Sequence, residues 1–438
     1  MRRVWAVALL SLVAITWRLW LPHFLTGQSQ WSTGQGQWIL AHFPAIPLIS
    51  LPRVVLAGLE SIGLLLALGS LIRLVLCPRS GAIVTFLLVC GLTALFVGNQ
   101  HRLQPWAYQA WLYAWVFTAW NTSRTCRVAL TWLTASVYFY SALGKFDMQF
   151  LHTVGPDFIR FLSLDGAGSS GAAEGSATEA FNPIALLLPI VELTIAISLL
   201  IPRSRRIAGW GAFAMHLSLF LLLGPLWMNQ SFAVLVWNLF LAAQAVWLFV
   251  LPGPVPDPSV ASTGSLPGTT GPPSPLSLHQ LLERKLRPVA SAIVLLALLL
   301  PTLERLPRGQ EYGYWDHWLS WSLYSPHTSR TDIQIHQSAI TELPERVRRF
   351  AEPSVDDDGW LNLRIDRWSL DELSVPVYPQ ARFQLAVAER LSRHVPPSAI
   401  RAKVRTTSQR LTGARGETWL SGRQAIKDHT KRFLLIGS

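Results

Sequence analysis

Charged residues are scarce in this sequence. Asp, Glu, Lys and Arg make up 14% of the 438 residues, whereas 50% are hydrophobic. A soluble globular domain carries roughly 25% charged residues, so the composition excludes an ordinary soluble protein. The formal net charge of +12 first suggests a nucleic-acid partner. The chain has no nucleic-acid-binding motif, however, and many basic residues flank apolar runs. The predicted partner is therefore membrane lipid and not nucleic acid.

Cysteine is equally rare. The three cysteines, Cys77, Cys90 and Cys126, lie inside or at the ends of apolar segments. This excludes a disulfide framework, which needs several cysteines in polar, loop-rich regions. The sequence also lacks a CxxC pair, a P-loop and a GxGxxG loop. The histidines show no metal-binding spacing, so the sequence predicts no metal.

Long apolar runs dominate the first 305 residues. A membrane-spanning helix needs ~20 mostly apolar residues to cross the hydrocarbon core. Nine runs meet or approach this length: 4–21, 54–76, 81–98, 106–120, 127–144, 184–201, 207–223, 232–251 and 288–305. The fourth is short and rich in Trp and Tyr, which favours a helix packed inside the bundle. Residues 1–305 are thus predicted to form an all-α polytopic membrane domain with about nine transmembrane helices.

The distribution of basic residues predicts the orientation of this domain. Loops on the same side as Arg2 and Arg3 carry most of the basic loop residues: Arg79, Arg124, Arg127, Arg203, Arg205, Arg206, Arg284, Lys285 and Arg287. The positive-inside rule places that side in the cytoplasm. No small-x-small cleavage site follows the first run, which we interpret as a retained helix and not a signal peptide. The prediction is a multi-pass protein of the inner (cytoplasmic) membrane with a cytoplasmic N-terminus.

Two segments interrupt the apolar pattern. Residues 165–182 are small and polar, and residues 252–280 are rich in Pro, Gly and Ser. Such compositions cannot bury enough apolar surface to pack a core. We expect a flexible outer loop and a disordered cytoplasmic linker, respectively.

The tail, residues 306–438, is polar. Its sequence alternates helical stretches (339–351 and 381–394) with strand-like stretches (360–368 and 400–411). Since nine crossings would place the tail outside, it is predicted to form a small extracytoplasmic α+β domain.

Ionisable residues within the apolar runs are the first functional candidates. A charge at the centre of a spanning helix costs ~2.5–3.5 kcal/mol, so such a group usually faces a partner or a cavity. Arg18 and Arg73 lie close enough to helix ends to reach water. Glu60 and Glu192 lie deeper. Each either pairs with an Arg or a helix dipole as an assembly device, or lines a pocket.

Lys145 is a candidate for a compositional reason. Only five of the 37 basic residues are Lys, yet one stands at the predicted outer end of the fifth helix, in YFYSALGKFDMQF. Arg does not give up its proton in a protein, whereas a desolvated Lys can do so and act as a base. The alternative is an interfacial Lys that reaches water or pairs with Asp147.

Two histidines lie near the predicted outer half of the bundle. His101 occurs in GNQHRLQPW, before the fourth helix, and His216 in GAFAMHLSLF, within the seventh. Each is either a hydrogen-bonded structural residue or part of a catalytic site.

Four segments together resemble the vitamin K-dependent gamma-carboxylase family and its broader HTTM membrane domain. They are YFYSALGKFDMQFL, GPDFIRFL, VELTIAISLLIPRSRRIAGWGAFAMHLSLF with MNQSF, and GYWDHWLSWSLYSPHTSRTDIQI. The resemblance covers about residues 1–335. It implies that Lys145, with its neighbour Asp147, matches the family's catalytic base. It also implies that Asn99 and His101, and His216 with Asn229, match the family's polar positions.

The resemblance further implies a reaction. The family oxygenates a vitamin K-type quinol with O2, and the strong base so formed allows CO2 to carboxylate a protein glutamate. No metal takes part, and the substrate would be a secreted protein or peptide at the outer face. Such chemistry needs a dry pocket open to lipid. Five aromatic residues are candidates for its wall: Trp106, Tyr108, Trp111, Tyr138 and Tyr140. The alternative for the aromatic cluster is an interfacial belt.

Two other functions are open at this point. One is a DoxX- or MauE-like quinone-linked membrane redox protein, although such proteins work with thiol partners and the predicted outer face has no cysteine. The other is a non-catalytic membrane scaffold whose Arg-rich outer tail binds a ligand, with its intramembrane polar residues serving helix packing.

Overall fold

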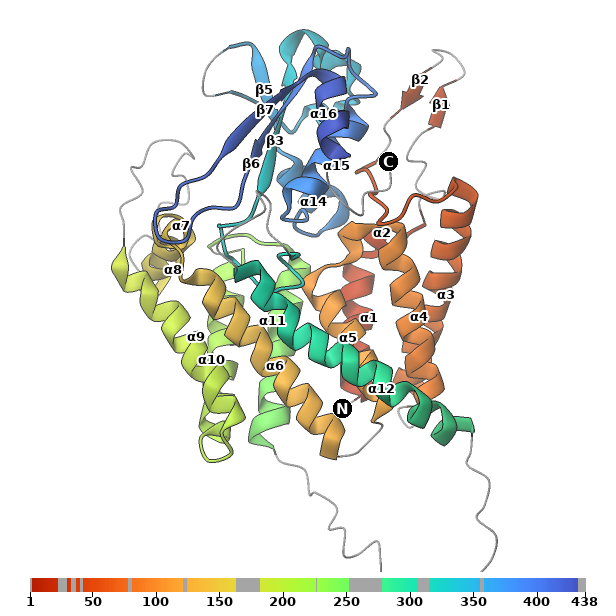
Figure 1. The fold of residues 1–438 in the computed structure, drawn as a ribbon, viewed down its shortest axis with the longest axis vertical. Coiled ribbons are helices and arrows are strands. Elements are labelled where there is room, and N and C mark those ends of the chain that lie inside the picture. The colour runs from red at the N-terminus through yellow and green to blue at the C-terminus, as the bar shows by residue number, and fades with distance from the viewer. Residues whose placement is uncertain are drawn as a thin grey trace, which may run out of the picture.

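The computed structural model describes residues 2–22, 30–32, 37–39, 42–77, 81–120, 124–162, 182–225, 227–251, 278–305, 315–354 and 358–431. A bundle of helices forms one end of the molecule, and a sheet with its own helices forms the other (Figure 1). The N-terminus lies on the side of the bundle away from the sheet. The predicted loop residues 165–181 and linker residues 252–277 lie outside the described residues, whereas residues 278–280 begin a helix.

A helix occupies each of the nine predicted apolar runs. They are α1 (Arg2–Ile15), α3 (Arg53–Leu76), α4 (Ala82–Gly98), α5 (Pro105–Ala119), α6 (Arg124–Lys145), α9 (Leu187–Leu200), α10 (Arg205–Leu223), α11 (Phe232–Ala245) and α12 (Leu278–Leu299). A 3-10 turn (Pro183–Leu186) precedes α9, a π turn (Val246–Val250) extends α11, and a 3-10 turn (Leu300–Arg305) extends α12. Three short helices and one more 3-10 turn (Gln100–Arg102) complete this part; the helices are α2 (Trp17–Trp20), α7 (Met148–His152) and α8 (Val154–Leu162). Their local signals include Pro105 at the start of α5 and the Ser231 cap of α11.

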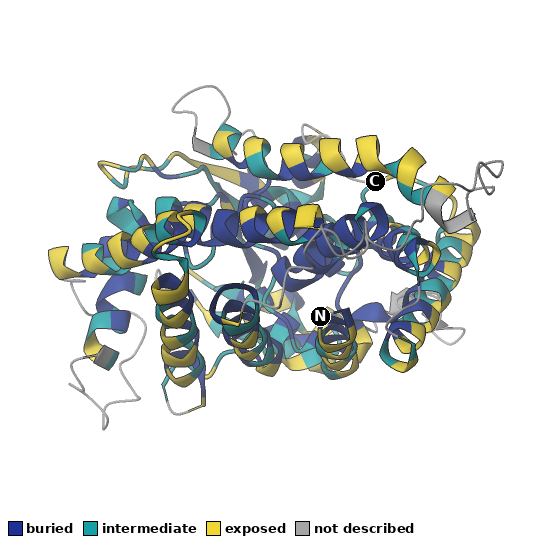
Figure 2. Cartoon of the chain, turned by 90° about the horizontal axis from the view of Figure 1, so that it is seen from below, coloured by how far each residue is buried: buried dark blue, intermediate teal, exposed yellow. Residues whose placement is uncertain are grey.

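Among the described residues, five helices are long and apolar enough to cross a membrane. These segments are Arg53–Leu76, Pro183–Leu200, Arg205–Leu223, Phe232–Val250 and Leu281–Glu304, and Ala82–Gly98 is a shorter apolar helix. The structure therefore supports five of the nine predicted crossings by length and composition. The outer helices expose much of their outward surface, whereas the interior of the bundle is buried (Figure 2).

The Trp/Tyr-rich helix α5 packs inside the bundle, as the sequence predicted. All of its residues except Trp111 are buried. At 15 residues α5 is shorter than a typical spanning helix. Because other helices surround it, its side chains pack against protein and need not match lipid.

The C-terminal part is built on a five-stranded antiparallel sheet. Its strands are β3 (Arg330–His336), β4 (Ala351–Pro353), β5 (Trp360–Leu363), β6 (Ile400–Arg405) and β7 (Glu417–Ser421), in the order β4-β5-β3-β6-β7. The helices α14 (Ile365–Leu373), α15 (Ala381–Leu391) and α16 (Gly422–Thr430) belong to this part, and α15 and α16 pack on the sheet. A 3-10 turn (Gln337–Glu342) and α13 (Glu345–Arg348) follow β3. Elsewhere β1 (Gln30–Ser32) and β2 (Gln37–Ile39) form a separate antiparallel pair.

This confirms a mostly helical protein with a small antiparallel sheet, and it corrects several predicted boundaries. The strand predicted over 360–368 ends at Leu363, and α14 begins at Ile365. The reason is the spacing of Ile365, Trp368 and Leu373, which are buried on one face of a helix. The strand predicted to reach 411 ends at Arg405, and the helix predicted over 339–351 is reduced to the 3-10 turn and α13.

The sheet part rests on the ends of the helices through hydrogen bonds. Arg410 Nη1 donates to the carbonyl oxygen of Leu143 at 3.0 Å, and the Met148 amide donates to the carbonyl oxygen of Arg410 at 2.7 Å. His42 Nδ1 lies 2.7 Å from Glu372 Oε1. The C-terminal end of α6 is thus one of the places where the bundle meets the sheet part.

Candidate functional site

Lys145, the last residue of α6, is buried and paired with a carboxylate. Its Nζ lies 2.6 Å from Glu192 Oε2 of α9 and 2.6 Å from Ser141 Oγ, one turn earlier on α6. The side chains of Lys145 and Glu192 are 7% and 11% exposed. Of the alternatives for Glu192, the structure shows a pairing role, with Lys145 and not an Arg as the partner.

Asp147 does not pair with Lys145. Its Oδ1 accepts a hydrogen bond from the Gln149 amide at 2.9 Å and caps α7. Its Oδ2 has no hydrogen-bond partner among the described residues. Burial raises the pKa of Asp147 to about 6, although Arg410 and Arg415 oppose this shift. Asp147 is therefore a capping residue beside the Lys145 site.

His216 lies in a second polar chain close to Lys145. Its Nδ1 is 3.0 Å from Asn238 Oδ1, and its Nε2 is 2.9 Å from the Tyr138 hydroxyl. Asn238 Nδ2 donates to the Val234 carbonyl oxygen, so Asn238 Oδ1 is an acceptor and His216 Nδ1 carries a proton. In a neutral imidazole Nε2 then accepts the proton of the Tyr138 hydroxyl.

The Lys145–Glu192 pair and the Tyr138–His216–Asn238 chain form one polar region between four helices. Tyr138 and Lys145 come from α6, Glu192 from α9, His216 from α10 and Asn238 from α11. Tyr138 and Lys145 lie seven residues apart, about two turns, on the same face of α6. We call Lys145, Glu192, Ser141, Tyr138, His216 and Asn238 the lysine site. It contains two of the three residues predicted to be catalytic, together with Glu192 and Tyr138.

His101, the third predicted catalytic residue, lies elsewhere. Its Nε2 is 3.1 Å from the carbonyl oxygen of Pro376, and its ring contacts those of Phe43 and Phe383. Asn99 Oδ1 accepts from the His101 amide at 3.0 Å. Burial lowers the pKa of His101 to about 4, so the ring is neutral at pH 7. The structure thus places His101 and Asn99 at the contact between the bundle and the sheet part.

The remaining predicted residues do not gather around the lysine site. Trp106 packs on Trp20, and the Tyr108 ring contacts those of Trp111 and Trp321. The Tyr140 hydroxyl donates to the Leu298 carbonyl oxygen at 2.5 Å. Asn229 has a positive φ of 45° in the turn before α11, where its amide donates to the Gly224 carbonyl oxygen. Of the five aromatic candidates, Tyr138 belongs to the lysine site.

Glu60 belongs to a second buried ion pair, away from Lys145. Glu60 Oε1 accepts from Arg102 Nη1 at 2.8 Å, and both side chains are 0% exposed. The same guanidinium also donates to the carbonyl oxygens of Leu19, Leu21 and Leu95. Arg102 therefore ties the end of α2 and α4 to α3, which is the assembly role that the sequence left open for Glu60.

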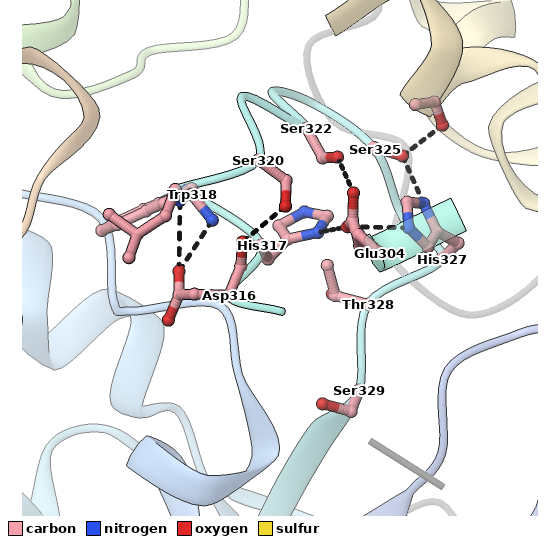
Figure 3. Close-up of polar contacts among 12 residues, drawn as sticks. Glu304, Asp316, His317, Trp318, Ser320, Ser322, Ser325, His327, Thr328 and Ser329 are labelled. Carbon is pink, nitrogen blue, oxygen red and sulfur yellow. Dashed lines mark hydrogen bonds and ion pairs between the residues drawn. The ribbon is translucent and has the colours of Figure 1, made fainter. Parts of the chain in front are cut away.

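A cluster that the sequence did not predict lies beside the end of α6. Glu304 Oε1 is 2.7 Å from His317 Nδ1 and 3.1 Å from His327 Nε2 (Figure 3). Ser322 Oγ donates to Glu304 Oε2, and Ser325 Oγ lies 2.6 Å from His327 Nδ1. Burial lowers the pKa of His327 to about 4. The histidines lie 13 and 23 residues from Glu304 along the chain. No local spacing could have revealed this cluster.

Comparison with known proteins gives no relative from which a function could be inferred. None of the family models, curated proteins or solved structures compared with the chain matches it.

Proposed function

We propose that this protein is an integral membrane enzyme that transfers a proton at Lys145 in a quinol-dependent carboxylation. The observation that carries the proposal is the 2.6 Å contact between Lys145 Nζ and Glu192 Oε2, buried between helices. A proton can cross this contact from the amine to the carboxylate. The pair then consists of an uncharged amine beside an uncharged acid.

The buried Arg102–Glu60 pair differs from the Lys145–Glu192 pair in its ability to exchange a proton. Arg102 keeps its charge at any working pH, so its pair with Glu60 cannot exchange a proton in this way. Arg102 and Glu60 are also fully enclosed, whereas Lys145 and Glu192 retain exposed fractions of 7% and 11%. The lysine site can therefore exchange a proton between its two members, which acid–base catalysis requires.

The donors of the lysine site support the choice of a quinol as the cofactor. Lys145 Nζ and Ser141 Oγ offer hydrogen-bond partners to a phenolic hydroxyl group, and apolar helices surround them. The quinol, when bound, supplies on oxygenation by O2 the base that allows CO2 to add to a glutamate side chain. Glu192 would hold the proton that Lys145 gives up, and the uncharged amine of Lys145 would then take the hydroxyl proton. The Tyr138–His216–Asn238 chain would hold α6, α10 and α11 in position.

The proposal also includes the arrangement of the chain in the membrane. Nine crossings with the N-terminus in the cytoplasm place the sheet part outside the inner membrane, where a secreted protein or peptide could reach the end of α6. The separation of the N-terminus from the sheet in Figure 1 supports this arrangement. The Arg/Lys asymmetry of the loops supports its orientation.

The test is incorporation of labelled CO2 into a glutamyl peptide by membranes containing the full-length protein, vitamin K hydroquinone and O2. Lys145→Arg keeps a cation for Glu192 but cannot give up its proton. We expect incorporation to fall by about 10²–10⁴-fold, the usual contribution of a general base. Glu192→Gln should also lower the rate.

Lys403→Ala is the matched control, because Lys403 Nζ lies 2.7 Å from Glu417 Oε2 in a partly exposed ion pair of the sheet. It should leave incorporation unchanged. Wild-type activity in Lys145→Arg would refute proton transfer at Lys145. Oxidation of the quinol that continues without CO2 would favour the redox alternative. If Lys145→Ala, His101→Ala and His216→Ala preserve the phenotype while loss of residues 306–438 abolishes it, the scaffold function is correct.

A further inference from the structure

The cluster of Glu304, His317 and His327 has the composition of a metal site. Glu304 lies in the 3-10 turn after α12, and the two histidines lie in the chain that leads to β3. Their side chains are 5%, 6% and 4% exposed. One ligand atom from each residue lies within 4.8 Å of the other two. Three buried donors therefore converge on one point.

The hydrogen bonds of Ser325 determine which nitrogen of His327 carries the proton. Ser325 Oγ contacts the carbonyl oxygen of Gly144, which can only accept, so the single hydroxyl hydrogen points there. His327 Nδ1, 2.6 Å from Ser325 Oγ, must then donate its proton to that oxygen. In a neutral imidazole this leaves a lone pair on Nε2.

The lone pair on His327 Nε2 faces a lone pair on a carboxylate oxygen of Glu304. His327 Nε2 lies 3.1 Å from Glu304 Oε1, and neither atom has a proton to offer the other. Two acceptors at this separation need a cation between or beside them. In this structure Arg410 Nη2 lies 3.2 Å from His327 Nε2 and supplies positive charge there.

The surrounding contacts resemble the outer shell of a metal site. A ligating histidine usually donates its other ring N–H to a fixed acceptor, as His327 does to Ser325. Ligating carboxylates are likewise hydrogen-bonded, and Ser322 Oγ donates to Glu304 Oε2 at 2.5 Å. Glu304 Oε1 is thereby directed toward the two imidazoles.

We propose that Glu304 Oε1, His317 Nδ1 and His327 Nε2 bind a divalent first-row transition-metal ion. Two imidazole nitrogens and one carboxylate oxygen form a donor set used by both zinc and non-haem iron proteins. The ion would replace the Arg410 guanidinium next to His327 Nε2. This site is separate from the lysine site and does not depend on the proposed carboxylation.

The test uses the purified full-length protein in detergent, stripped with a chelator and then titrated separately with Zn²⁺, Co²⁺ and, without oxygen, Fe²⁺. We expect one ion per chain by elemental analysis, and for Co²⁺ a visible absorption band. The intensity of the Co²⁺ band distinguishes a tetrahedral, zinc-like site from a six-coordinate one.

Variants separate metal binding from a hydrogen-bonded cluster. Glu304→Gln, His317→Ala and His327→Ala should each abolish stoichiometric binding, and Ser325→Ala should weaken it by about 10–100-fold. Arg410→Gln should strengthen binding, because it removes the competing cation. His336→Ala, a histidine that bonds to Ser338 outside the cluster, should change nothing.

Two results would overturn the proposal. One is the absence of stoichiometric binding of all three ions by folded wild type and Arg410→Gln. The other is retention of the ion in folded His317→Ala and His327→Ala. Gel filtration and circular dichroism establish folding in each case. Lys145→Arg should bind the ion normally, so failure here and failure of the proposed carboxylation are separate outcomes.

Discussion

At the scale of single residues, the buried Arg102 side chain holds several parts of the bundle together. Arg102 bonds one carboxylate and three backbone carbonyl oxygens, without contact with solvent. A charge in such a place is tolerated only while its partner remains, because desolvation of an unpaired ion is costly. Lys145 differs from Arg102 in that it can become neutral.

The permanent charge of Arg102 predicts a large loss of stability for Glu60→Gln. The substitution leaves the Arg102 charge buried without its carboxylate, which costs about 3–5 kcal/mol of the free energy of unfolding. Thermal unfolding in detergent measures the effect.

Asp371→Asn is the control, since Asp371 pairs with Arg349 at the surface, where ion pairs contribute about 0–1 kcal/mol. Equal losses in both variants would mean that the Arg102–Glu60 pair is not the stabilising element that its burial implies.

At the scale of elements, small residues allow α3 and α4 to approach closely. A Cβ added at Gly91 would lie 2.7 Å from the backbone nitrogen of Ala67 and 2.7 Å from the carbonyl oxygen of Gly63. Both atoms belong to the backbone of α3 and cannot move alone. Glycine at this position therefore sets the distance between the two helices, as small residues do in membrane bundles.

Gly91→Ala should separate α3 from α4 and lower the free energy of unfolding by about 1–3 kcal/mol, as overpacking of a close contact does. Gly69→Ala is the control, because a Cβ there meets nothing within 4 Å. It should leave the thermal midpoint unchanged or slightly raised. A midpoint that is equal in the two variants would contradict the close-approach role of Gly91.

At the scale of the whole molecule, the docking of the sheet part on the bundle depends on a neutral histidine. His101 contacts the Pro376 carbonyl oxygen and Ser369 Oγ across this contact, and its Nδ1 has no hydrogen-bond partner among the described residues. Burial lowers the pKa of His101 from 6.5 to about 4. The unfolded chain therefore takes up this proton at a higher pH than the folded chain.

The contribution of neutral His101 to the free energy of unfolding is fully present above pH 6.5 and should be lost as the pH falls toward 4. The slope approaches roughly 1.4 kcal/mol per pH unit within this window. Backbone amides of α14 and of the segment that follows it should then exchange faster with deuterium. His101→Gln, which can still donate to the Pro376 carbonyl oxygen, should reduce the slope relative to wild type, and identical slopes would exclude His101 as its source.

The sequence alone determined where the helices lie. Apolar runs over 54–76, 207–223 and 232–251 coincide with α3, α10 and α11 within a few residues, because length and apolar content are local properties of the chain. The burial of α5 also followed from composition, since its Trp and Tyr content suits a protein interior. Strand boundaries in the tail were less accurate, because Trp360–Leu363 is too short to define a period and α14 follows at once.

Only the tertiary structure decided which polar groups meet. Lys145 lies 47 residues from Glu192, and His216 lies 78 residues from Tyr138. Local sequence contains no information on such distances, so it could nominate Lys145 and His216 but not their partners. The same limit hid the Glu304 cluster, whose members meet only because α12 returns to the end of α6. Helix formation is a short-range property of the chain, whereas the pairing of buried charges is set by how the helices pack.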